Sequence, residues 1–271
     1  MIHKAVILAA GSGNRISAVA RNVPKPLLPL SGEPGSSPTF LDWHVRALSA
    51  AGVKEIYLVG NPRTFGNEVE AAGGAKVTWI LNPTEEGAPT GSGHSTWFAW
   101  QSKHNILDGK SRVVLMDADI LYDPSIYGIL DAHPSPKSKT LVCSDYRHTN
   151  EEVLVFAKSN ALDMPLFHGK GLLERPLPAG TQCIGEATGI LLWEPTDHEA
   201  LNRATDWAIQ FSTAKVRSEH EDITQCMMLA ERVAAVGFSR DLSFMECDTP
   251  EEYAVLTSEM YPKLRGLLGY R

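Results

Sequence analysis

The feature that most restricts the fold of this chain is a short apolar run that ends in a glycine turn. Residues 5–10 read Ala-Val-Ile-Leu-Ala-Ala and lead directly into Gly11-Ser12-Gly13. A run this short and apolar is typical of a buried strand. The two glycines allow a sharp turn and leave backbone N–H groups that no side chain covers, and such groups form a concave anion site. The opening therefore predicts a strand and loop that hold a phosphate-rich ligand.

Two positive charges follow the turn. Arg15 comes directly after it, and Lys25 stands between two prolines that stiffen the backbone carrying it. Both side chains suit a phosphate, although Arg15 could instead pair with Glu33 or Asp42, and most lysines in loops are simply solvated. No Gly-Lys-Ser/Thr closes the turn, so it is not a P-loop. It also lacks the third glycine and the later acidic residue of the dinucleotide fingerprint, which argues against a Rossmann oxidoreductase.

Strand-like runs alternate with amphipathic stretches along the rest of the chain. This alternation predicts an α/β fold with a mostly parallel twisted sheet sandwiched by helices. We expect strands at 53–60, 75–81, 112–116, 140–143 and 189–193, and helices at 40–51, 93–103, 125–132, 197–210, 221–233 and 250–268. Residues 151–188 contain a Gly- and Pro-rich stretch that predicts a hairpin or lid on the substrate side of one domain, residues 1–271.

The segment Leu8–Arg15, followed by Pro-Lys-Pro-Leu at 24–27, resembles the signature of the nucleotidyltransferases with a Rossmann-like, GT-A-type fold. These enzymes join a nucleoside triphosphate to a phosphate-bearing partner and release pyrophosphate. The resemblance implies that Arg15 and Lys25 are catalytic, with Lys25 bridging to the phosphate of the second substrate. It also implies that the loop holds the nucleotide through Leu8, Ala9, Ala10, Gly11, Ser12, Gly13 and Asn14.

The resemblance continues over roughly residues 2–256. Gly91-Ser92-Gly93 is similar to the segment that reads the base, and residues 113–119 are similar to the strand end that binds metal. Residues 185–190 resemble the acceptor-pocket segment, and residues 245–253 resemble a late Asp-Thr-Pro element. The Asp117-Ala118-Asp119 form looks most like the phosphocholine and phosphonate cytidylyltransferases. Asn14 stands where sugar-nucleotide members have threonine, and their Leu-x-Pro-Leu-Thr run is missing, which weakens a sugar-phosphate assignment.

Carboxylates at strand ends supply the expected metal site. Mg²⁺ binds a few carboxylates together with phosphates and water, and ligands of open α/β sheets gather at the carboxyl ends of the strands. We expect Asp119 and Asp248 to be the metal ligands, with Asp117 beside Asp119 at the nucleotide. The alternatives are that an aspartate caps the turn at Asp123, and that Asp248 or Thr249 only caps the following helix.

A third acidic set is the candidate acceptor site. If the acceptor carries a cationic head group, a wall made by Glu186, Glu221 or Asp222 would attract it. The alternative is that His220-Glu221-Asp222 is only the acidic first turn of a helix.

Composition narrows the class of protein. The net charge of −7 argues against general nucleic-acid binding, and every apolar run is too short to cross a membrane. The start of the chain lacks a signal-peptide pattern. The four cysteines are far apart, without a C-x-x-C pair, so we expect reduced thiols, no zinc and a cytoplasmic location.

These observations together predict a Mg²⁺-dependent nucleotidyltransferase that couples CTP to a small phosphate or phosphonate, of the phosphocholine or 2-aminoethylphosphonate type. One alternative keeps the reaction but uses a sugar-1-phosphate with UTP, GTP or dTTP. The other is a catalytically silent, nucleotide-binding regulatory subunit of the same fold, against which the retention of Arg15, Lys25, Asp119 and Asp248 argues. A homo-oligomer is compatible with either.

Overall fold

The structure is a computed structural model. It describes residues 1–11, 13–20, 23–33, 36, 38–69, 73–83, 91–146, 152–172, 176–212, 217–239 and 241–270.

Strands and helices alternate through the first half of the chain, as the sequence predicts. The strands are β1 (Lys4–Ala9), β2 (Glu55–Gly60), β3 (Lys76–Leu81), β4 (Val113–Asp117), β5 (Ile120–Tyr122), β6 (Ser138–Cys143), β7 (Leu154–Lys158), β8 (Ala161–Gly169), β9 (Thr181–Trp193), β10 (Val233–Phe238) and β11 (Phe244–Glu246). The α-helices are α1 (Ser17–Ala20), α2 (Phe40–Ala50), α3 (Ser92–Trp100), α4 (Ile126–Ala132), α5 (His198–Gln210), α6 (His220–Leu229), α7 (Pro250–Val255) and α8 (Tyr261–Leu264). Short 3₁₀ turns lie at Asn14–Ile16, Lys25–Leu27, Pro195–Asp197 and Arg265–Leu268, and a π-helical turn lies at Leu256–Met260.

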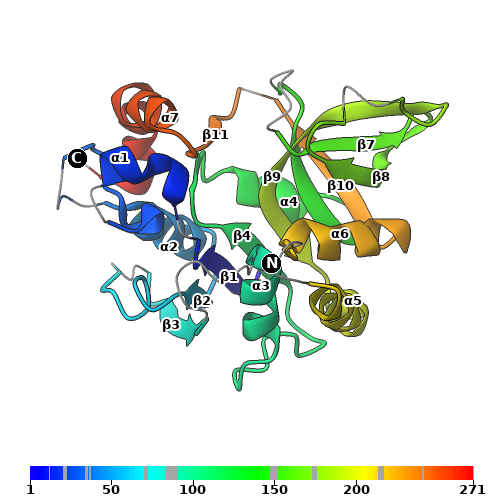
Figure 1. Ribbon diagram of the computed structural model, residues 1–271, viewed down its shortest axis with the longest axis horizontal. Coiled ribbons are helices and arrows are strands. Elements are labelled where there is room, and N and C mark those ends of the chain that lie inside the picture. The colour runs from blue at the N-terminus through cyan, green and yellow to red at the C-terminus, as the bar shows by residue number, and fades with distance from the viewer. Residues whose placement is uncertain are drawn as a thin grey trace.

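The main sheet has the strand order β10-β6-β9-β4-β1-β2-β3 (Figure 1). β1 lies inside it, parallel to both β2 and β4, and Leu8 is in register with Asp117. The glycine turn after β1 and the aspartates after β4 therefore leave the sheet at the same edge. This register confirms that the two parts of the predicted site are neighbours.

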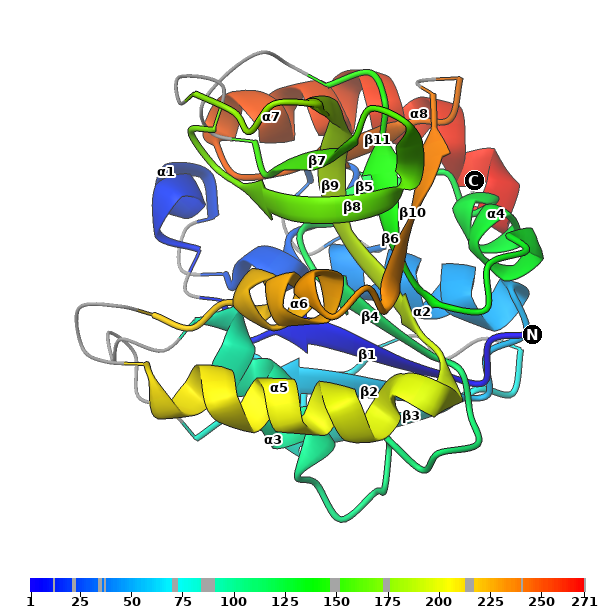
Figure 2. The ribbon, with the colours of Figure 1, turned by 90° about the vertical axis from the view of Figure 1, so that its right-hand side faces the viewer.

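Helices cover both faces of the sheet, which is why β1 is buried along its whole length. Val6 and Leu8 face a core layer with α3, α5 and α6. Ala5 and Ile7 face the opposite layer with α2, α4 and the C-terminal helices. Figure 2 shows α3 and α5 on one side of the strands and α6 between α5 and the β7–β8 hairpin. The predicted α/β sandwich is confirmed.

The middle of the chain departs from the expected strand direction. β9 is longer than the strand predicted at 189–193 and runs antiparallel to β4, β6 and β7. β7 and β8 form the expected hairpin, which pairs with the first half of β9. A strand buried on both faces has the same apolar pattern in either direction, so the sequence does not distinguish them.

Two predicted helices are wrong in extent. The helix expected at 221–233 ends at Leu229, because Glu231 has a left-handed backbone (φ 55°) and the chain then enters strand β10. The helix expected at 250–268 is broken into short pieces around the π-helical turn Leu256–Met260. Pro262 lacks an N–H group, and its ring crowds the carbonyl four residues earlier, which prevents a regular helix there.

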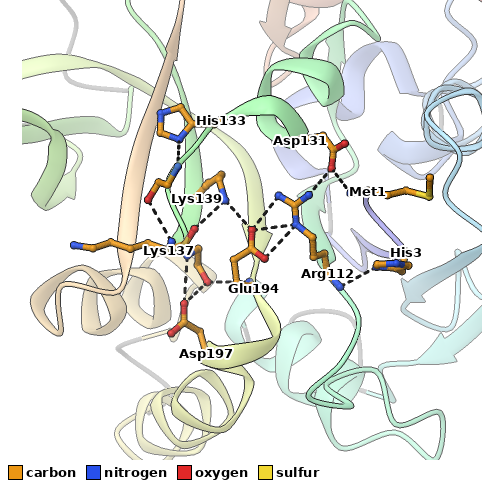
Figure 3. A network of polar contacts seen from close by, with 11 residues as sticks. Met1, His3, Arg112, Asp131, His133, Lys137, Lys139, Glu194 and Asp197 are labelled. Carbon is orange, nitrogen blue, oxygen red and sulfur yellow. Dashed lines mark hydrogen bonds and ion pairs between the residues drawn. The ribbon is translucent and has the colours of Figure 1, made fainter.

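A buried polar network joins the strands at the opposite edge of the sheet from the glycine turn (Figure 3). Glu194, just after β9, accepts hydrogen bonds from Lys139 Nζ at 2.7 Å and from Arg112 Nε at 3.0 Å. Arg112 also pairs with Asp131, and Asp131 with the amino group of Met1. Lys139 is almost completely buried, so Glu194 compensates its charge inside the protein.

None of the helices in the described part of the chain combines the length and apolar character that crossing a membrane requires.

Candidate active site

A pocket of about 310 Å³ opens where the glycine turn meets the ends of β4 and β11. The backbone at its rim includes Gly13, which has a left-handed conformation (φ 63°) and packs on the side chain of Lys25, where a larger residue would be crowded. Its lining is rich in charge. The lining residues are Leu8, Gly11, Gly13, Arg15, Lys25, Pro26, Ala118, Asp119, Arg217 and Asp248.

Lys25 lies between the two aspartates that the sequence predicts as metal ligands. Its Nζ donates to Asp119 Oδ2 at 2.7 Å and to Asp248 Oδ1 at 2.6 Å. Burial alone would lower the pKa of Lys25, but the charges and hydrogen bonds of the two aspartates raise it above its ordinary value. Lys25 is therefore a fixed cation at the floor of the pocket.

Two arginines provide further positive charge at this pocket. Arg15 Nη2 pairs with Asp248 Oδ2 at 2.6 Å, and the Arg15 side chain is more than half exposed. It does not pair with Asp42, whose carboxylate caps α2 by accepting from the Thr39 N–H. Arg217 comes from the segment before α6 and lines the same pocket. Three cationic side chains from distant parts of the chain thus surround one cavity.

A small antiparallel ladder brings Asp119 and Asp248 together. β11 pairs with β5 so that Glu246 lies opposite Ile120, and the Cys247 N–H donates to the Asp119 carbonyl at 2.9 Å. Neither aspartate is occupied as a cap: Thr249 Oγ1 caps α7. Both carboxylates are therefore available to the pocket.

Glu246 completes an acidic group that the sequence reasoning missed. One carboxylate oxygen from each of Asp119, Glu246 and Asp248 lies within 4.8 Å of the others. Burial and the charges of Asp119 and Asp248 raise the pKa of Glu246 well above its ordinary value. By contrast, Lys25 and Arg15 outweigh burial and lower the pKa of Asp248. An all-oxygen group of three carboxyls fits a hard divalent cation such as Mg²⁺.

Asp117 does not belong to this acidic group and binds a histidine. Its Oδ2 lies 2.9 Å from His220 Nε2, and His220 is buried in the first turn of α6. Burial would lower the pKa of His220, but the charges of Asp117 and Glu221 raise it to about 10. The histidine is therefore an imidazolium at neutral pH. Nothing in the local sequence around Asp117 signals this partner, which lies 103 positions later.

A second, smaller cavity of about 60 Å³ lies on the other side of the acidic group. Its acidic lining residues are Asp117, Glu221 and Glu246, and its basic ones are His168, Lys170 and His220. Thr140, Thr188 and Thr224 add hydroxyl groups.

Of the three acidic residues predicted to bind the acceptor, Glu221 lines this cavity. Asp222 instead accepts from the Glu219 N–H at 2.9 Å, which is the helix-capping alternative. Glu186 lies on β9 opposite Cys143 and lines neither cavity. The acceptor roles of Glu186 and Asp222 remain predictions.

The segment expected to read the base is held by the start of α6. The backbone N–H and the Oγ of Ser92 donate to Glu219 Oε2 at 2.6 and 2.7 Å, and the Gly93 N–H donates to the Ser218 carbonyl at 2.9 Å. The close approach that Gly91 and Gly93 permit is used by the chain itself.

The predicted nucleotide loop is described in most of its parts. Leu8 and Gly11 line the larger pocket, and Ala9 and Ala10 lie at the end of β1, where the Ala10 carbonyl accepts from Asn61. Ser12 and the side chain of Asn14 lie outside the described residues. The nucleotide-binding roles of this loop, and those of Gly91 and Ser92, remain predictions.

Two curated proteins are similar to parts of this chain. A CMP-5'-(3-aminopropyl)phosphonate synthase from Streptomyces rubellomurinus is 31% identical over 134 residues, which are 48% of this chain and 19% of that protein. An N-acetylmuramate alpha-1-phosphate uridylyltransferase from Neisseria meningitidis is 35% identical over 88 residues, which are 32% of this chain and 35% of that protein. The chain thus matches about a fifth and about a third of these relatives' lengths.

Solved structures share the whole fold. The inositol-1-phosphate CTP transferase from T. maritima superposes with a TM-score of 0.72 at 16% identity, covering 100% of this chain and 98% of that one. An apo UDP-glucose pyrophosphorylase has a TM-score of 0.69 at 13% identity, covering 97% and 99%. The family model described as the MobA-like NTP transferase domain matches residues 5–175. With this match, the glycine turn and the shared fold, the chain belongs to the MobA-like NTP transferase family.

Proposed function

We propose that this chain transfers a nucleotidyl group from a nucleoside triphosphate, CTP in the first place, to a small amine-bearing phosphate or phosphonate, with release of pyrophosphate. The observation that carries the proposal is the larger pocket, in which Arg15, Lys25 and Arg217 meet Asp119 and Asp248. Cations bind the triphosphate, and the carboxylates suit the metal that accompanies it. A catalytically silent subunit would not need both the cationic side chains and the carboxylates.

The reaction asks the protein mainly for positioning and charge stabilisation. A phosphate or phosphonate oxygen of the acceptor forms a bond to the α-phosphorus, and the bond from that phosphorus to the β-phosphate oxygen breaks in line with it. Pyrophosphate leaves with the electron pair. Arg15 and Arg217 hold the triphosphate at the mouth of the pocket. Lys25, held by Asp119 and Asp248, faces the phosphates of the nucleotide and the acceptor as they approach each other.

Asp119, Asp248 and Glu246 would hold a divalent cation, Mg²⁺ by the chemistry of their oxygens. When bound, that ion neutralises charge on the phosphates and orients them. Lys25 shares two of these carboxylates, so it keeps them close together and limits their mutual repulsion.

The smaller cavity supports a short cationic acceptor. Its volume is about 60 Å³, against about 310 Å³ for the larger pocket, which suits a short chain better than a sugar ring. Glu221 lines it, and its charge favours an ammonium group. A relative whose name specifies an aminopropylphosphonate product agrees with this choice.

The test compares two acceptors that differ in charge but not in shape. Pyrophosphate release from CTP is measured with 2-aminoethylphosphonate and with n-propylphosphonate, which has a methyl group in place of the ammonium. We expect a clear preference for the amine in the wild type, and a raised KM for the amine alone in Glu221→Gln. Asp206→Asn serves as the control, since Asp206 lies on α5, accepts a hydrogen bond from Trp97 of α3 and lines neither cavity.

Equal use of the two acceptors would overturn the acceptor class. A preference for UTP, GTP or dTTP with a sugar-1-phosphate would favour the alternative substrates. Absence of turnover with every nucleotide and acceptor, in a protein that still binds CTP, would favour the regulatory subunit.

A further inference from the structure

Residues 217–221 reach both pockets of the candidate site. Arg217 lines the larger pocket, and Glu221 lines the smaller one. Between them, Ser218 and Glu219 hold the start of α3, and His220 binds Asp117. We call these five residues the arm. Figure 2 shows the start of α6, where the arm ends, close to α3 and to the strands of the sheet.

His220 is the residue that fixes the arm to the sheet. Its ring is buried, its Nε2 lies 2.9 Å from Asp117 Oδ2, and its backbone N–H donates to Ser92 Oγ at 2.9 Å. Its Nδ1 faces Glu221 Oε2 at 3.6 Å. One residue thus contacts the end of β4 and the wall of the smaller cavity through its ring, and the start of α3 through its backbone N–H.

Asp117 is shaped to receive this contact. Gly189 on β9 has a left-handed backbone (φ 71°), and a Cβ at that position would overlap the Asp117 carboxylate. The aspartate is therefore confined between β9 and His220. Its oxygens do not belong to the group formed by Asp119, Glu246 and Asp248, so it anchors the arm instead of adding to the acidic group.

We propose that His220 is a positioning residue that couples the two substrate pockets. Because Arg217 and Glu221 lie on one short arm, a ligand that holds one of these side chains in its binding position also favours the binding position of the other. Nucleotide and acceptor therefore bind with positive coupling, which requires the Asp117–His220 contact. This inference rests on the proposed function, since it takes the two pockets to be the nucleotide and acceptor sites.

The test measures binding without turnover. The Kd of α,β-methylene-CTP is determined by calorimetry in the presence of Mg²⁺, with and without saturating 2-aminoethylphosphonate. In the wild type we expect the phosphonate to tighten nucleotide binding by about tenfold, within the usual range for coupled sites. The coupling ratio is the Kd of the nucleotide without the phosphonate divided by its Kd with the phosphonate. In His220→Asn, whose amide is too short to reach Asp117, we expect this ratio to fall close to one.

Three further variants separate positioning from folding. His220→Gln places an amide N–H about where Nε2 lies, and we expect it to restore part of the coupling. Ser92→Ala removes the hydroxyl that bonds to Glu219 and to the His220 N–H of the arm, and it should also lower the ratio. His198→Asn is the matched control. His198 is likewise the buried first residue of a helix, and its side chain accepts a hydrogen bond from the Gly109 N–H at 3.0 Å. It lines neither pocket.

Mn²⁺ affinity, followed by electron paramagnetic resonance, should stay unchanged in His220→Asn, since the acidic group is intact. A wild-type coupling ratio in both His220→Asn and Ser92→Ala would overturn the inference, as would equal loss of coupling in His198→Asn. If the wild type does not bind the nucleotide, or does not bind the phosphonate, the proposed function is overturned instead, and this inference with it.

Discussion

At the scale of single residues, the candidate site depends on how charges are distributed around Lys25. The lysine is buried and bound by Asp119 and Asp248, and Arg15 pairs with the second oxygen of Asp248. Glu246 stands beside them without an ion pair to Lys25 or Arg15 among the described contacts. The three carboxyl groups can bind a divalent cation, while Lys25 competes for two of them.

Replacing Lys25 with methionine separates these two effects. The variant loses a fixed cation that stabilises the phosphates, so kcat should fall by about 10²–10³-fold, the usual loss for one preorganised group. It also loses the cation that competes for Asp119 and Asp248, so the Kd for Mn²⁺ should decrease. Electron paramagnetic resonance titration with Mn²⁺, beside steady-state kinetics, measures both. Weaker Mn²⁺ binding would mean that Lys25 builds the metal site instead of competing with it.

The site residues that the sequence predicts are those that a local motif marks. Asp119 and Asp248 each stand at a strand end next to turn residues, and the structure brings them to one pocket. Arg217 carries no such mark, and the patterns that contain His220 and Glu246 do not single out these two residues. Their place depends on the contact between α3 and α6 and on the β5–β11 ladder, which pair residues far apart in the chain. Only tertiary packing brings these side chains to the site.

At the scale of elements, the period of the hydrophobic pattern and the local composition predict where helices and strands occur. They do not predict whether a strand is parallel or antiparallel to its neighbours. α2 and α4 lie where amphipathic spacing predicts them. β9 is antiparallel and β10 starts where a helix was expected to end. β10 and residues 190–193 of β9 are apolar and mostly buried, so these sequences contain no alternation that would reveal a neighbour.

The contact between α6 and β4 gives the protein a characteristic pH dependence. His220 has a pKa of about 10 in the folded protein, against about 6.5 in an unfolded chain. Below pH 6.5 both states hold the proton, so the ion pair with Asp117 contributes fully. Between pH 6.5 and 10 the unfolded chain releases its proton first, and this contribution is lost as the pH rises.

The thermal midpoint should therefore fall more steeply between pH 6.5 and 10 in the wild type than in His220→Gln, which has no titrating group there. Differential scanning calorimetry of both proteins across this range measures the difference. Parallel curves would show that His220 titrates in the folded protein as it does in the unfolded chain.

At the scale of the whole molecule, the candidate active site and the polar network that stabilises the fold lie at opposite ends of the strands. The pockets lie where β1 and β4 end, and the network of Glu194, Lys139 and Arg112 lies where β4 begins and β9 ends (Figure 3). The five residues of β4 separate them by about 16 Å, at the usual rise of roughly 3.3 Å per residue. Changes in the network should therefore alter stability without altering turnover.

Glu194→Gln tests this separation. It leaves the buried Lys139 without its counter-charge, which costs about 3 kcal/mol, the lower end of the range for breaking a buried ion pair. Urea unfolding followed by tryptophan fluorescence measures the loss. Glu199→Gln is the control: its pair with Arg203 is exposed, so its loss should stay below about 1 kcal/mol. A change in KM or kcat of Glu194→Gln at 25 °C would show that the two ends are not independent.

The central claim is that Asp119 and Asp248 form, with the cations around them, the centre at which a nucleoside triphosphate loses pyrophosphate. The most direct measurement is pyrophosphate release from CTP with 2-aminoethylphosphonate as a function of Mg²⁺, for the wild type and for Asp119→Asn, which removes one charge at nearly constant volume. We predict Mg²⁺-dependent release by the wild type, and a loss of at least about 10²-fold in a variant with an unchanged thermal midpoint. Release by Asp119→Asn at the wild-type rate and the same Mg²⁺ concentration would contradict the account.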